Sequence, residues 1–180
     1  MERIPGGATV NLFPNRSGAN ISPDGVYRWS LWREWDASLP TCTFLMLNPS
    51  TADDQANDPT ITRCISRARA LGCGRLEVVN LYPLRSTNPD ELLAYHDPVG
   101  PIGKADGAIL DAVERAGVGG YTICAWGAHK AAPQRAESVL HTLSIVGFRS
   151  ILWHLGLNKD GSPKHPLYVA ASVKPRRWTT

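Results

Sequence analysis

The sequence predicts an α/β fold, a single domain in which a mostly parallel central sheet is flanked by helices and carries an N-terminal antiparallel edge element. Two observations predict it. Short apolar segments typical of buried strands alternate along the chain with segments of helical periodicity. The chain has 180 residues, of which 43% are hydrophobic, which is enough for one core. We therefore expect one domain over residues 1–180, with 1–25 largely irregular, a core over 26–173 and a basic tail over 174–180.

The first two strands are predicted from opposite patterns. Segment 27–35, YRWSLWREW, alternates apolar and polar side chains, which indicates an antiparallel strand near an edge of the sheet. Segment 41–48, TCTFLMLN, has no polar face, so we expect a strand that is buried on both sides.

The first helix is predicted from its cap and its apolar stripe. In segment 58–72, Asp58 can cap the helix, Pro59 suits the first helical position, and apolar residues recur at helical spacing. The remaining elements follow in alternation: a buried strand over 75–84, a broken helical region over 90–116, a strand over 121–127, a helix over 133–143 and a strand over 150–156.

Composition limits the class of protein. No run of about 18 apolar residues is present, which argues against a membrane span, and the N-terminus lacks an apolar signal core, so we expect a cytoplasmic protein. The cysteines form no C-x-x-C pair and are expected to be small core residues, with no metal and no cofactor. The net charge of +3 permits a phosphate-bearing partner. The oligomeric state is left open.

Polar residues gather where the predicted strands end. Asn48-Pro49-Ser50 follows the buried strand over 41–48, Asn80 lies in the next one, and His129 and His165 follow the last two. In an open α/β sheet, ligands bind outside the carboxyl ends of the strands. These residues therefore predict a ligand site at that edge.

Four of these segments resemble motifs of mismatch-specific and single-strand-selective uracil-DNA glycosylases, in the same order. MLNPS is similar to their G-x-N-P-G motif, VVNLYPLRSTNP to their second-strand motif, AWGAH to their L-G-x-x-A segment and KHPLY to their H-P-S-P motif. The chain as a whole resembles a family of unknown function from bacteria and phages, through YRWSLWR, MLNPSTAD, NDPT, VVNL and HPLY.

The glycosylase resemblance implies an enzyme that hydrolyses the N-glycosidic bond of uracil or a 5-substituted pyrimidine, with a nucleic acid or nucleotide as the partner. It also implies roles for individual residues. Asn48 matches the residue that positions a water, Asn80 the amide that reads the base edge, and His165 the donor to the leaving base. Ser50 stands where uracil-specific members carry a bulky tyrosine, so a 5-substituted pyrimidine is expected to fit. Tyr82 lies two residues beyond Asn80, on the same side of the predicted strand, and could stack on the base. Further expected contacts are Pro49, His129 and the wedge candidate Tyr168.

Two other functions fit the same residues. The first is a non-catalytic protein that binds nucleic acid or a modified nucleotide. The second is a hydrolase that uses Ser50 or Thr51 as nucleophile with His129 or His165 as base, although no G-x-S-x-G motif is present. Asp53, Asp54 and Asp58 are explained more simply by solvent exposure and helix capping than by a metal.

Overall fold

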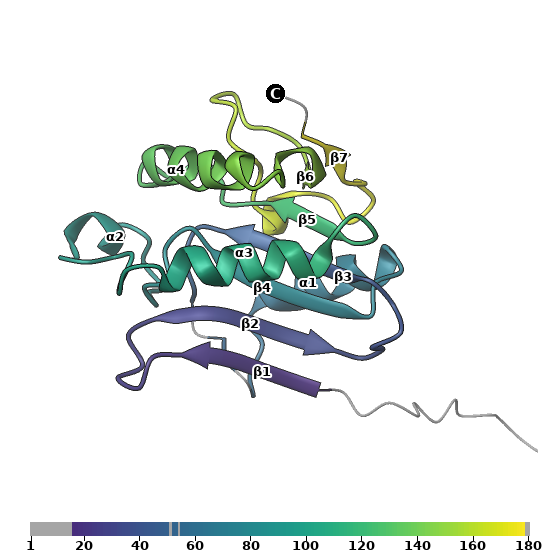
Figure 1. Cartoon of the computed structure of the whole chain (residues 1–180), viewed down its shortest axis with the longest axis horizontal. Coiled ribbons are helices and arrows are strands. Elements are labelled where there is room, and N and C mark those ends of the chain that lie inside the picture. The colour runs from purple at the N-terminus through teal and green to yellow at the C-terminus, as the bar shows by residue number, and fades with distance from the viewer. Residues whose placement is uncertain (1–15, 51, 54, 179–180) are drawn as a thin grey trace, which may run out of the picture.

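A computed structural model, which describes residues 16–50, 52–53 and 55–178, shows an α/β protein built on one seven-stranded sheet (Figure 1). The strand order is β1-β2-β4-β3-β5-β6-β7. Their bounds are Arg16–Ile21 (β1), Arg28–Glu34 (β2), Thr41–Met46 (β3), Arg75–Asn80 (β4), Tyr121–Cys124 (β5), Leu152–His154 (β6) and Arg176–Arg177 (β7).

The sheet is mixed rather than mostly parallel. The four central strands β4, β3, β5 and β6 are parallel, whereas β1 pairs with β2, β2 with β4, and β6 with β7 in antiparallel fashion. The difference from the expectation comes from β1 and β7, which lie in segments predicted to be irregular or a tail. Their sequences, RSGANI and RR, are polar and largely exposed, so neither shows an apolar pattern.

The helices follow the predicted alternation. They are α1 (Pro59–Ala70), α2 (Glu91–Ala94), α3 (Lys104–Ala116) and α4 (Ala132–Ile145), with 3₁₀ turns η1 (Arg149–Ile151) and η2 (Pro166–Tyr168). Asp58 caps α1 as predicted, since its side chain accepts a hydrogen bond of 2.8 Å from the Ile61 N–H. Gly100 and Gly103, both at positive φ, separate α2 from α3 and account for the broken helical pattern.

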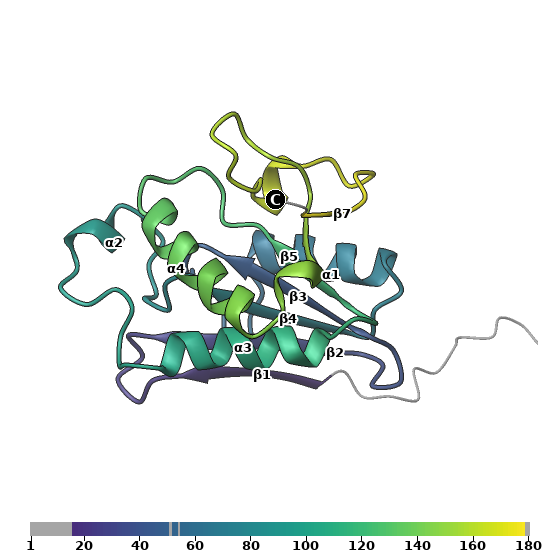
Figure 2. The same ribbon diagram turned by 45° about the horizontal axis from the view of Figure 1, so that its top comes forward.

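Both faces of the sheet are covered, which explains why β3 has no polar face. Phe44 and Met46 pack in one cluster with Ile61 and other residues of α1. Leu45 packs in a second cluster with residues of α3 and α4, among them Ile109 and Val139. Figures 1 and 2 show α3 and α4 on the same side of the sheet.

Two further predictions can be compared with the structure, namely that the cysteines are core residues and that no helix spans a membrane. Cys42, Cys64, Cys73 and Cys124 are all buried and unpaired, as the prediction of small core residues requires. Among the described helices, none combines the length and apolar character needed to cross a membrane.

Candidate functional site

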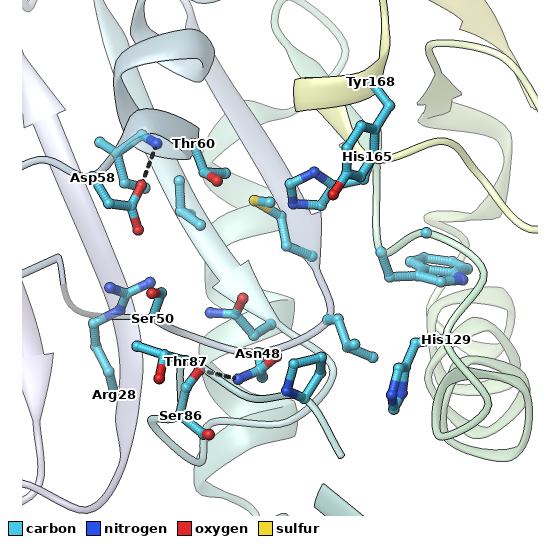
Figure 3. Close-up of a pocket in the computed structure, with 18 of the residues that line it drawn as sticks. Arg28, Asn48, Ser50, Asp58, Thr60, Ser86, Thr87, His129, His165 and Tyr168 are labelled. Atoms are coloured by element: carbon cyan, nitrogen blue, oxygen red, sulfur yellow. Dashed lines mark hydrogen bonds between the residues drawn. The ribbon is translucent and has the colours of Figure 1, made fainter. Parts of the chain in front are cut away.

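A cavity of about 450 Å³ lies at the carboxyl ends of the four parallel strands (Figure 3). Asn48 and Ser50 follow β3, Asn80 is the last residue of β4, the turn from Trp126 to His129 follows β5, and His165 lies beyond β6. The remaining lining residues are Arg28, Met46, Leu47, Asp58, Thr60, Ile61, Val78, Ser86, Thr87, Pro89 and Tyr168. Strands that are distant in sequence thus deliver their polar ends to one cavity.

Asn48 is held by the segment that follows β4. Its Nδ2 donates hydrogen bonds to the carbonyl oxygens of Ser86, at 2.9 Å, and of Pro49, at 3.1 Å (Figure 3 shows the first). The Pro49 carbonyl also accepts a 2.9 Å bond from the Ser86 N–H, so the two segments are tied together. Because Nδ2 is the donor in both contacts, Oδ1 of Asn48 is left as an acceptor without a partner in the described part of the chain.

Asn80 is a buried amide with a hydrogen-bond donor that the described residues leave unsatisfied. Its side chain lines the cavity although the residue is only 3% exposed, and its Nδ2 is buried without a hydrogen-bond partner among the described residues. A buried amide that lacks a partner costs about 1–3 kcal/mol. A buried polar group without a partner in a native protein calls for an explanation, and a ligand that supplies the missing acceptor is one such explanation.

His165 has a neutral imidazole ring whose Nε2–H can donate a hydrogen bond. Its Nδ1 accepts a hydrogen bond of 3.4 Å from the Leu167 N–H, so the proton of the neutral ring is on Nε2. Burial lowers the pKa of His165 below its usual 6.5, an effect that the charge of Asp58 partly opposes. The turn at Gly127 brings this segment over the sheet, because Gly127 adopts φ +77° and its N–H donates to the Pro163 carbonyl at 2.9 Å.

His129 and Tyr168 also line the cavity; the ring of His129 is held by its polar contacts, whereas Tyr168 is largely exposed. The Nδ1 of His129 accepts from the Ala131 N–H at 3.2 Å, and its Nε2 lies 3.4 Å from Asp90 Oδ1, so both ring nitrogens have partners. Tyr168 is 84% exposed, and its ring centroid lies 5.7 Å from that of His165. His129 therefore fixes the turn after β5, whereas Tyr168 offers an aromatic face beside His165.

Two predicted contacts lie outside the cavity. Tyr82 packs against the cluster under α3 and α4, and its hydroxyl donates to the Ala131 carbonyl at 2.8 Å. The expectation that it shares a side with Asn80 is wrong, because β4 ends at Asn80 and strand alternation ends with it. Pro49 is buried and acts through its carbonyl on Asn48 and Ser86.

Ser50 lines the cavity, but among the described residues it is not hydrogen-bonded to His129 or His165, the histidines expected to act as its base. Thr51 and Asp54 lie outside the described residues. No group of three or more metal-ligating side chains occurs among the residues searched, which are the described ones.

Sequence reasoning missed two charged residues of the cavity. Arg28 was expected on the polar face of an edge strand, yet it is 2% exposed and lines the cavity. Asp58 was explained as a helix cap, which it is, but its carboxylate also lines the cavity. No pattern in YRWSLWR distinguishes the buried Arg28 from a solvated one; only its contacts with distant segments reveal it, since its backbone N–H donates to the Pro83 carbonyl and its Nη1 to the Ala52 carbonyl.

Comparison with known proteins identifies a family whose function is unknown. The chain belongs to the family described as "Protein of unknown function (DUF1643)", whose sequence model matches residues 28–167. No curated protein and no solved structure matches the chain.

Proposed function

We propose that this member of the DUF1643 family recognises a pyrimidine, in nucleic acid or as a nucleotide, and hydrolyses its N-glycosidic bond. The observation that carries the proposal is the Nδ2 of Asn80, which has no partner among the described residues. It lies in the wall of a cavity that also contains Asn48 Oδ1, likewise without a described partner, and the neutral ring of His165.

Asn80 is suited to read the edge of the base. An amide offers two donors and one acceptor, which complement the O4 and N3–H of a uracil-like ring. The unpartnered Nδ2 would donate to O4, and Oδ1 would accept from N3–H. A ligand that bonds in this way removes the cost of the buried amide, so binding is favoured over an empty cavity.

The bond cleavage needs opposite charges to be stabilised at the sugar and at the base. As the C1′–N1 bond breaks, its electron pair leaves with the base, and a water adds to C1′. Asn48 Oδ1 can accept a hydrogen bond from that water, while the Nε2–H of His165 can donate to O2 of the departing base. A preorganised donor of this kind contributes about 3–4 kcal/mol to a transition state. Asn48 cannot take the proton of the water; Asp58 is a carboxylate in the same cavity that could.

The resemblance to uracil-DNA glycosylases supports the assignment, since its four motifs supply Asn48, Asn80, the turn after β5 and His165 to this cavity. Two departures shape the expected substrate. Ser50 leaves space beside the base, which favours a 5-substituted pyrimidine. The exposed ring of Tyr168 can stack on a neighbouring base, which favours a nucleic acid.

The test is base release from single- and double-stranded oligonucleotides that contain uracil, hydroxymethyluracil or other 5-substituted pyrimidines. We expect release by the wild type and by Asn20→Ala, an exposed asparagine of β1 that serves as the control. Release should be lost in Asn48→Ala and in His165→Gln, with folding checked by circular dichroism. No release from any substrate would refute the hydrolase. Binding of the same panel that depends on Asn80 would then indicate a non-catalytic binding protein.

A further inference from the structure

Arg28 is a buried cation whose donors are mostly unused. The residue opens β2, is 2% exposed and lines the cavity. Its Nη1 donates to the Ala52 carbonyl at 2.7 Å, and its Nε is buried without a partner. Within residues 16–50, 52–53 and 55–178, its Nη2 makes no hydrogen bond and no carboxylate lies within ion-pair distance of it.

A second buried arginine shows what a purely structural role looks like. Arg67 of α1 is 5% exposed, and its Nη1 and Nη2 donate to the carbonyls of Val169, Ala170 and Val173 at 2.7–3.2 Å. Both arginines lack a partner at Nε, so the difference lies in the Nη groups. Arg67 uses its Nη groups to hold the C-terminal segment. Arg28, which lines a cavity, has most of its N–H donors without a partner among the described residues.

Arg28 keeps its charge at neutral pH. Its surroundings lower the pKa of the guanidinium to about 10, mainly through burial and also through the nearby cations Arg85 and Arg33, while Asp58 and Asp53 oppose the shift. The two carboxylates are already engaged: Asp58 accepts from the Ile61 N–H, and Asp53 accepts from the N–H groups of Gln55 and Ala56. Among the residues that the structure describes, three guanidinium groups act on one another and on two carboxylates here, and this balance favours an added negative charge.

We propose that Arg28 binds an anionic group of the ligand, a carboxylate or a phosphate, inside this cavity. A guanidinium can hold either group through two parallel hydrogen bonds. In the view of Figure 3, the guanidinium of Arg28 points toward the side of the cavity where Ser50 and Asp58 are drawn, opposite the two histidines. The volume of about 450 Å³ leaves room for such a group beside a pyrimidine ring. The nature of that ring rests on the proposed function, but the anion site does not.

The anion site is tested first with inorganic phosphate as the ligand. Thermal unfolding is followed over a range of phosphate concentrations at constant ionic strength, in the wild type, Arg28→Met, Arg28→Lys and Arg67→Met. We expect phosphate to raise the Tm of the wild type and of Arg67→Met, to act more weakly on Arg28→Lys and to leave Arg28→Met unchanged. Equal shifts in the wild type and Arg28→Met, or no shift in the wild type, would overturn the proposal.

The source of the anion is tested on the wild type, which needs no variant to fold. Titration calorimetry compares 5-carboxyuracil with thymine, in which a methyl replaces the carboxylate, and uridine 5′-monophosphate with uridine. A charge-assisted contact should make one anionic ligand at least about tenfold tighter than its neutral partner. The first pair reports an acidic base substituent and the second a nucleotide phosphate; equal affinities within both pairs would contradict the proposal.

The outcomes separate this inference from the proposed function. Phosphate binding that depends on Arg28, together with no base release and no binding of any pyrimidine, would support the anion site and refute the nucleobase site. Base release that is unchanged by Arg28→Met, without any response to phosphate, would support the nucleobase site and refute the anion site.

Discussion

Replacing Asn80 with leucine is expected to stabilise the fold and to abolish ligand binding. The residue is 3% exposed, its Nδ2 has no partner among the described residues, and its neighbours in the cavity wall include Met46, Val78 and Ile61. Leucine has a similar shape but no polar atom, so the cost of the unpaired amide, about 1–3 kcal/mol, is removed. The repacking of a tight site offsets part of that gain. We therefore expect the free energy of unfolding to rise by about 1 kcal/mol.

The matched control is Asn48→Leu, the same substitution at the other cavity asparagine. Its Nδ2 donates to the carbonyls of Pro49 and Ser86, so leucine removes two hydrogen bonds, and we expect a loss of about 1–3 kcal/mol. Urea unfolding of the two variants and the wild type measures both changes, provided that the m-values agree. If Asn80→Leu were destabilised as strongly as Asn48→Leu, the amide of Asn80 would have to be satisfied within the native protein, and the argument for a ligand would fail.

Three further predictions test the pH response, the core and the helix cap. Because burial lowers the pKa of His165, the unfolded chain binds the proton more readily, so stability should fall as the pH drops below about 6.5. A pH titration of unfolding in which His165→Gln keeps the same slope would contradict this assignment. Phe44→Ala, at a fully buried position of β3, should cost about 3–5 kcal/mol in urea unfolding, and a loss below 1 kcal/mol would contradict the packing described. Asp58→Ala should cost about 1 kcal/mol through loss of the cap on α1, whereas Asp58→Ser should retain most of it, and equal losses would argue against capping.

The central elements could be predicted because their sequences have one physical interpretation. A segment such as TCTFLML has no polar face, and only a strand covered on both sides buries all of it. The helix α1 was equally well defined, since the Asp58 cap, Pro59 and the apolar stripe indicate the same start and the same buried face. The strand ends then follow, and with them the grouping of Asn48, Asn80 and His165.

The elements and contacts that were missed depend on pairings between distant segments. The sequence RSGANI of β1 is polar, so only its backbone pairing with β2 makes it a strand. Tyr82 was assigned to the site by strand alternation, but β4 ends at Asn80, four residues before the predicted end at residue 84. Arg28 looked like a solvent-facing residue, because its contacts are with the segment after β4, at Pro83, and with the loop that contains Ala52.

Asn80 and Arg28 are two buried polar side chains that have donors without a partner among the described residues, and they share one cavity. An amide at the end of a buried strand and a guanidinium inside a sheet both lower stability unless a partner satisfies them. Asn48 in the same cavity and the Nη groups of Arg67 show that this chain can satisfy such groups with backbone carbonyls. The unused donors of Asn80 and Arg28 are therefore best explained by one ligand that supplies both a carbonyl edge and a negative charge. A binding site that costs stability when empty is expected where function, rather than folding, selects the residues.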